Sequence, residues 1–222
     1  MFLAELADRS GTSVASIKYY RREELLPAGE RVTTTRQEYG QVHLDRLALI
    51  RTLRETASAS IPDIRALTSV LDDPQRPLVH ALKVAQAIVS GLPTDAREDA
   101  PREDEHRMIR SLLQEMDWPD VSTGARDGLD DLLSQMDAWG VPYDPEDLQF
   151  YARTLEVLAA RDLERIRRPS ATSAERGDSA WDGAPTRDRV VARAVSGMIA
   201  YDRMLSVLRA LAHASLSVRD AS

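Results

Sequence analysis

Residues 3–20, with the sequence LAELADRSGTSVASIKYY, have the pattern of two short helices joined by a tight turn. Gly11 lies between the helices, where a turn with positive φ favours glycine. Each helix can bury one side through spaced apolar residues, which are Leu3, Leu6, Val14 and Ile17, with the small Ala7 where the helices would cross. This pattern predicts a helix-turn-helix, a shape that fits the DNA major groove.

The second helix of the pair should begin at Ser13, whose hydroxyl can accept a hydrogen bond from a backbone amide of the first turn. With Val14 and Ile17 predicted to point inward, the other side carries side chains that can bond base edges or phosphate. The candidate DNA-binding residues of this helix are Ser13, Ser16, Lys18, Tyr19, Arg21 and Arg22. We expect the helix to read DNA, and the sequence leaves open which base each side chain contacts.

The sequence SVASIKYYRREELLP, which contains this second helix, resembles the segment S-V-x-T-I-R-Y-Y-x-x-x-x-L-L-P of the MerR (mercury-resistance regulator) family. A second segment, EYGQVHLDRLALIRTLRE, is similar to the family motif Y-x-x-x-x-L-x-R-L-x-x-I. Two separate motifs in the right order are far more specific than one helix-turn-helix match. The resemblance extends over residues 2–72 and implies a winged helix-turn-helix DNA-binding domain, which we place at residues 1–72.

The resemblance places a short β wing at residues 27–39. Where many family wings carry two basic residues before the tyrosine, this chain has Gln37 and Glu38. The wing should therefore bind phosphate more weakly, and the residues that we expect to contact DNA from it are Arg31, Arg36 and Tyr39.

Helix starts in this domain also depart from the family. Phe2 stands where a Ser or Thr usually caps the first helix, and the lost side-chain acceptor costs about 1 kcal/mol. Gly40 is likewise a weaker cap for the third helix. By contrast, Ser60 can cap a helix that has Pro62 in its first turn and Asp63 near its positive end, and this helix should extend through about residue 71.

Residues 42–56 show a helical apolar stripe with arginines on the other sides. Arg46 or Arg51 could contact phosphate, and a solvated arginine face explains them equally well. The next predicted helix spans residues 75–89, where the resemblance implies a long antiparallel dimer helix in many MerR relatives. Here it has only about four turns, so we assign residues 73–104 to a connecting helix and linker, with a hinge at 93–105.

Residues 105–222 read as an all-helical effector or dimerisation domain, so the expected fold class is all-α with a small β wing. The predicted helices cover approximately residues 103–116, 125–139, 145–167 and 186–216, and a mobile polar loop is expected at 169–185. By helix count this part loosely resembles the effector domains of the TetR (tetracycline-repressor) family. The helix at 186–216 could form a subunit interface, or equally well a core helix.

Aromatic and methionine side chains in this second part could line a pocket for a small apolar effector. The candidate ligand-binding residues are Trp118, Trp139, Tyr143, Phe150, Tyr151, Tyr201 and Met204. Packing in the helical core is the alternative explanation for the same residues, because aromatics at helical spacing are usually buried.

The net charge of −7 is unevenly distributed. Residues 1–70 contain 10 Lys and Arg against 9 Asp and Glu, whereas residues 71–222 contain 19 against 27. Phosphate attraction is local, since salt screens charges over about 10 Å. A basic face on the first domain can therefore bind DNA while the second domain stays acidic.

Several classes of function are disfavoured. The chain has no cysteine, which excludes thiolate metal sites and disulfides, and its four histidines show no paired spacing. We predict no metal, no cofactor and no catalytic site, because no nucleophile arrangement or phosphate-binding loop is visible. Without a signal peptide or an apolar run of about 20 residues, we expect a cytoplasmic protein that does not bind membranes.

Together the motifs and the resemblance predict a homodimeric, sequence-specific transcriptional regulator that binds an inverted repeat in promoter DNA and responds to a ligand through its C-terminal domain. In the MerR family such dimers distort the promoter so that RNA polymerase, a further expected partner, can engage it, at a cost of a few kcal/mol. Repression by occlusion stays open. In the alternative function, the acidic helical domain binds a protein partner that controls activity. Ligand sequestration without an effect on DNA is a third.

Overall fold

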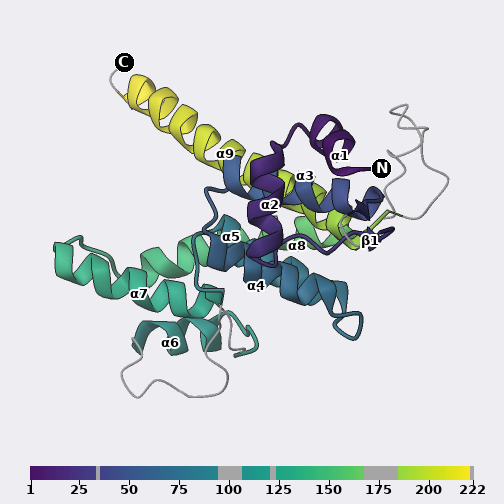
Figure 1. Cartoon of the computed structure of the whole chain (residues 1–222). Helices are drawn as coiled ribbons and strands as arrows, with labels where there is room; N and C mark the ends of the chain where they lie inside the picture. The colour runs from purple at the N-terminus through teal and green to yellow at the C-terminus, as the bar shows by residue number, and fades with distance from the viewer. Residues whose placement is uncertain (34–35, 95–106, 121–123, 168–184, 221–222) are drawn as a thin grey trace. The chain divides into compact units, whose positions relative to one another are not determined.

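The computed structural model describes residues 1–33, 36–94, 107–120, 124–167 and 185–220 (Figure 1). The described residues are mostly helical and include a two-stranded sheet, which confirms the expected all-α class with a small wing. By contacts the chain divides into two compact units, unit 1 with Met1–Thr94 and Pro185–Ser222, and unit 2 with Asp95–Ala184. None of the described helices is long and apolar enough to cross a membrane.

Unit 1 begins with the helix-turn-helix. Helix α1 (Leu3–Ser10) ends at Gly11, whose φ of 64° lies in the left-handed region that favours glycine. Helix α2 (Val14–Arg22) is capped by the Ser13 hydroxyl, which accepts a hydrogen bond from the Ser16 amide at 3.0 Å. Both features agree with the sequence prediction.

The two helices bury Leu6 and Ile17 completely. Val14 differs from the prediction, because its side chain is 38% exposed. Val14 is the first residue of α2, directly after the turn. The residue that α2 buries is Ile17, one helical turn later.

The wing consists of β1 (Glu30–Arg31) and β2 (Gln37–Glu38), paired antiparallel with Glu30 opposite Glu38. A Cβ added at Gly29 would lie 2.6 Å from the Glu38 carbonyl oxygen, so the strands can approach here only because this residue is glycine. The Tyr39 amide donates to the Met1 carbonyl at 2.8 Å, which ties the end of the wing to the start of α1.

The remaining helices of unit 1 are α3 (Gln41–Glu55), α4 (Ile61–Asp72), α5 (Leu78–Val89) and α9 (Arg187–Asp220). As predicted, Phe2 gives α1 no side-chain cap, and Ser60 and Asp63 form a capping box for α4. At α3 the missing side chain of Gly40 is offset, because the Gly40 amide donates to Nδ1 of His43 at 2.9 Å.

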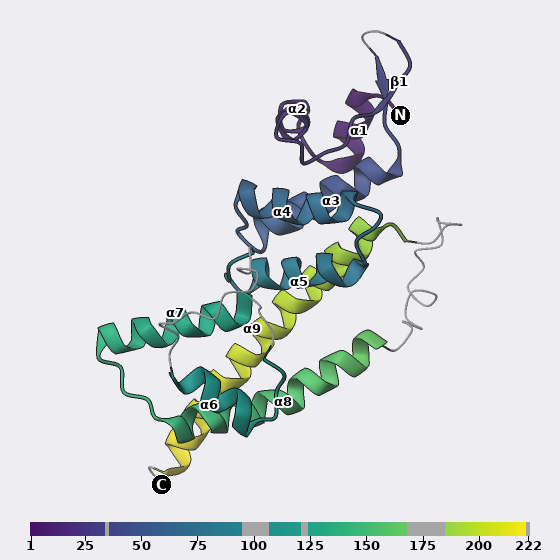
Figure 2. The ribbon, with the colours of Figure 1, turned by 90° about the horizontal axis from the view of Figure 1, so that it is seen from below.

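The main core of unit 1 joins α3, α4, α5 and α9. Leu49, Leu53, Ala81, Val191 and Val195 are completely buried in one cluster. In Figure 2 the helix-turn-helix is followed by a layer that contains α3 and α4 and then by one that contains α5 and α9, and α9 contacts both α3 and α5. The expected single domain at 105–222 therefore differs from the structure, because α9 packs with the N-terminal helices in unit 1.

Unit 2 contains α6 (Arg107–Glu115), α7 (Gly124–Trp139) and α8 (Pro145–Arg167), close to three of the predicted helices. Asp144 caps α8 by accepting from the Asp147 amide at 2.7 Å. Among the described residues of this unit, the buried apolar side chains are Ile109, Leu112, Leu133 and Ala152. Nearly all of the predicted hinge and of the predicted mobile loop lies outside the described residues.

Candidate nucleic-acid interface

Helix α2 presents polar and basic side chains away from the buried Ile17. Lys18 and Arg22 are exposed, and Tyr19 is half-buried with the Arg22 guanidinium 5.3 Å from its ring centre. The hydroxyl oxygens of Ser13 and Ser16 lie 2.9 Å apart at the start of the helix. A nucleic acid can therefore reach these side chains, and their chemistry suits bases and phosphates.

Arg21 connects this helix to the wing through Tyr39. The Arg21 Nη1 donates to the Tyr39 hydroxyl at 2.9 Å, and that hydroxyl donates to Oε1 of Gln37 at 3.2 Å. Tyr39 itself is only 2% exposed, and its ring packs edge-to-face against His43 with centroids 5.1 Å apart. Tyr39 therefore holds Arg21 in place, a role that its sequence position alone did not reveal.

The wing carries both signs of charge. Arg31 and Arg36 are exposed, as a contact with phosphate requires, and the Arg36 guanidinium lies 3.6 Å from the centre of the Phe2 ring. Glu30 and Glu38 face each other across the two strands. Because the two carboxylates offset the two arginines, the wing adds little net attraction for DNA.

The arginines of α3 differ in exposure and in their hydrogen-bond partners. Arg51 is exposed, and its Nη1 donates to the Ser10 carbonyl at 3.2 Å, next to the turn between α1 and α2. Arg54 donates to the Ala59 carbonyl at 3.1 Å. For Arg46 the sequence offered a phosphate contact or a solvated face, and both interpretations are wrong. Its side chain is only 1% exposed, so it neither faces solvent nor can reach phosphate.

Arg46 is the centre of a buried ionic cluster between three helices. Its Nε donates to Oδ1 of Asp188 in α9, its Nη2 donates to Oδ1 of Asp72 in α4 at 2.5 Å, and its Nη1 donates to the Leu25 carbonyl at 3.1 Å. Burial by itself would lower the pKa of Arg46, but hydrogen bonds to Asp72 and Asp188 and their charges raise it above its usual value. The guanidinium thus stays charged and joins α9 to the DNA-binding helices.

Neighbouring side chains strengthen this junction. The Thr186 hydroxyl donates to Oδ2 of Asp45 at 2.7 Å, and Arg187 donates to the carbonyls of Asp73 and Arg76 at 2.9 and 2.7 Å. No sequence signal pairs these residues, because more than 100 positions separate the partners.

The seven predicted ligand-binding residues divide between the two units. Tyr201 and Met204 lie on the exposed part of α9 in unit 1. In unit 2, Trp139, Phe150 and Tyr151 are exposed, and Trp118 and Tyr143 are half-buried. Three of the five side chains in unit 2 are thus exposed rather than enclosed.

Trp118 and Tyr143 are held by carboxylates of unit 2. The Trp118 Nε1 donates to Oε1 of Glu156 at 3.0 Å, and the Tyr143 hydroxyl donates to Oδ1 of Asp137 at 2.9 Å. Desolvation, the hydrogen bond to Asp137 and the charge of Asp137 raise the pKa of Tyr143 above its ordinary value.

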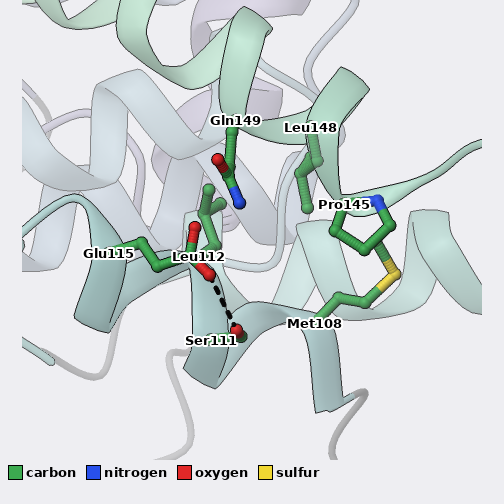
Figure 3. A pocket seen from close by; sticks show the side chains of 7 residues that line it. All are labelled: Met108, Ser111, Leu112, Glu115, Pro145, Leu148 and Gln149. Carbon is green, nitrogen blue, oxygen red and sulfur yellow. Dashed lines mark hydrogen bonds between the residues drawn. The ribbon is translucent and has the colours of Figure 1, made fainter.

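A different set of residues lines a cavity of about 230 Å³ between α6 and α8 (Figure 3). Its walls are Met108, Ser111, Leu112, Glu115, Pro145, Leu148 and Gln149. Ser111 donates to Oε1 of Glu115 at 3.3 Å at one side of this mostly apolar space. The cavity contains none of the predicted aromatics, and the amphipathic pattern of residues 107–115 is the one sequence signal for it.

A helix-turn-helix with an exposed basic second helix and an adjacent wing defines a DNA-binding protein. Residues 1–70 match the family model described as MerR HTH family regulatory protein, so the chain carries a MerR-family helix-turn-helix domain, as its two motifs predicted.

A crystal structure from Streptomyces coelicolor A3(2), described as a "putative transcriptional regulator", is 27% identical and has a TM-score of 0.56. The similarity covers 99% of this chain and 97% of that one. No curated protein matches the chain. In class, the protein is a DNA-binding regulator of transcription.

Proposed function

We propose that this protein acts as a homodimer on an inverted repeat in promoter DNA, with one α2 in each of two major-groove half-sites. The observation that carries the proposal is the set of exposed and half-buried polar and basic side chains on α2, a helix held by the buried Ile17 and capped by Ser13. Two-fold symmetry of a dimer matches the symmetry of an inverted repeat. RNA polymerase is a further partner if the bound dimer distorts the promoter.

The α2 and wing residues have separate roles in this proposal. Ser16, Lys18 and Arg21 contact base edges or phosphate in the groove, while Tyr19, Arg22, Arg31 and Arg36 contact the backbone beside it. Tyr39 acts through Arg21, because its own ring is buried.

Fluorescence anisotropy tests this function directly. Purified protein is titrated onto the DNA upstream of its own coding sequence and onto a scrambled duplex, at several salt concentrations. We expect preference for the upstream DNA and an affinity that falls with salt as counterions are released. Equal binding to both duplexes, or none, would count against sequence-specific regulation.

In the same assay, Lys18→Ala and Arg21→Ala should each weaken operator binding by about 1–3 kcal/mol if the side chain contacts a base, and less if it contacts phosphate. Lys83→Ala is the matched control, since Lys83 is an exposed lysine of α5 in the same unit. Wild-type affinity in both α2 variants would exclude this helix as the reader.

We also propose that a small apolar effector controls the DNA-binding activity. The cavity between α6 and α8 supports this more directly than the dispersed aromatics do, because Met108, Leu112 and Leu148 provide an apolar lining. A screen of small hydrophobic molecules by thermal shift should find stabilising compounds, and Leu112→Trp, which fills the cavity, should abolish their effect. A screen that finds none would favour control by another protein.

The protein-partner function is supported by the exposed apolar side chains of α8. Phe150, Leu155 and Val157 are each more than half exposed, which is unusual for large apolar residues on one helix. In this case a stoichiometric protein would bind unit 2 and change DNA affinity in the anisotropy assay without any small molecule.

A further inference from the structure

Helix α9 has two halves with different surroundings. Its first half, with Val191 and Val195, is buried against α3 and α5, and Asp188 bonds Arg46. Beyond Ile199 the helix continues for about 20 residues, or roughly 30 Å, with nearly every side chain exposed. A long exposed helix is stable only when another surface covers its apolar side.

The exposed half has a heptad pattern. Residues at alternating spacings of three and four form one face, which we call the α9 face: Tyr201, Met204, Leu208, Leu211, Ser215 and Val218. Met204, Leu208 and Leu211 at its centre are 44%, 52% and 61% exposed. This spacing is that of the a and d positions of a two-helix seam.

Side-chain sizes on this face are complementary to the same face turned end for end. Consider an antiparallel pair of helices whose two-fold axis passes between Leu208 and Leu211. Leu208 of each helix then lies opposite Leu211 of the other helix. The large Met204 then meets the small Ser215 of the other helix. Tyr201 meets Val218 in the outermost layer. Large residues thus face smaller ones outside the leucine centre, as close packing requires.

The residues that flank the α9 face follow the same rule. In the same register Leu205 lies beside Ala212 of the other helix, and Val207 lies beside Ala214. The only Asp, Glu, Lys or Arg residues between positions 201 and 218 are Asp202, Arg203 and Arg209, and all three lie off the face. The α9 face thus carries no charged side chain that would favour an oppositely charged partner. The sizes of its side chains instead favour a second copy of the same helix.

We propose that the α9 face forms an antiparallel, two-fold interface with the α9 face of a second copy of this chain. The inference rests on the homodimer of the proposed function and identifies its seam. Because the first half of α9 is fixed to α3, α4 and α5 of its own unit 1, the seam joins two DNA-binding units through continuous helices.

Charge substitution tests the seam in the full-length protein. Leu208→Glu with Leu211→Glu should raise the dissociation constant of the dimer about 100-fold or more, because association would then bury unpaired carboxylates. Ser206→Glu with His213→Glu is the matched control, since both residues are exposed on the opposite side of the same turns. Light scattering after gel filtration gives the mass of each variant, and far-UV circular dichroism confirms that each is folded.

Cysteine cross-linking tests the direction of the helices, and the natural chain contains no cysteine that could interfere. Met204→Cys and Ser215→Cys proteins should form a disulfide-linked dimer when mixed under mild oxidation, and much less when either is oxidised alone. Efficient cross-linking of each variant alone would overturn the antiparallel seam.

The outcomes separate this inference from the proposed function. A wild-type dimer that survives Leu208→Glu with Leu211→Glu would overturn the α9 seam and leave the homodimer intact. A wild-type protein that stays monomeric at all concentrations, including on operator DNA, would overturn both, and the α9 face would then be covered by unit 2 or by a different protein.

Discussion

Asp188→Ala is expected to destabilise unit 1 by about 3–5 kcal/mol, because it leaves the Arg46 guanidinium charged, buried and short of one carboxylate partner. The side chains of Arg46 and Asp188 are only 2% and 7% exposed, so water cannot replace the lost bond. Arg46→Ala should cost a similar amount by leaving Asp188 unpaired. Urea unfolding followed by far-UV circular dichroism measures the change.

Asp72→Ala is the matched control for this prediction. Asp72 also bonds Arg46, but its side chain is 47% exposed, so its loss should cost only about 1 kcal/mol. Residues 1–94 and 185–222, which form unit 1, contain no tryptophan, so tryptophan fluorescence does not report on this unit directly and circular dichroism is needed. Equal effects of Asp188→Ala and Asp72→Ala would show that α9 is not held by a buried ion pair.

A fragment of residues 1–94 is expected not to fold cooperatively, although it contains the whole MerR-type domain. Without α9 the fragment loses Val191 and Val195 from its core, and Arg46 loses Asp188. Removing these groups should cost about 5 kcal/mol or more, which is as much as the whole stability of many small domains. Thermal unfolding by circular dichroism, compared with the full chain, measures the effect.

Restoring α9 provides the control for this fragment. A chain in which residues 185–222 follow residues 1–94 through a flexible Gly/Ser linker should regain a cooperative transition and operator binding, because unit 1 is then complete. If residues 1–94 unfold as cooperatively as the full chain does, the DNA-binding helices are independent of α9.

The local features of this protein could be predicted well from its sequence. Ser13, Ser60 and Asp144 cap helices as expected, and Gly11 makes the turn between α1 and α2. Such caps and turns depend on residues only a few positions apart, so their chemistry is complete within the local sequence. For the same reason the two motifs were enough to predict the winged helix-turn-helix.

The tertiary structure decided the roles of residues whose partners are distant in sequence. Arg46 and Tyr39 are residue types that often contact DNA. In the structure, however, Arg46 lies in a buried ion cluster, and Tyr39 positions Arg21. The periodicity of α9 showed an apolar helix, but it could not show that this helix returns to α3 and α5. Periodicity determines which side of a helix must be buried, whereas the surface that buries it depends on the path of the whole chain.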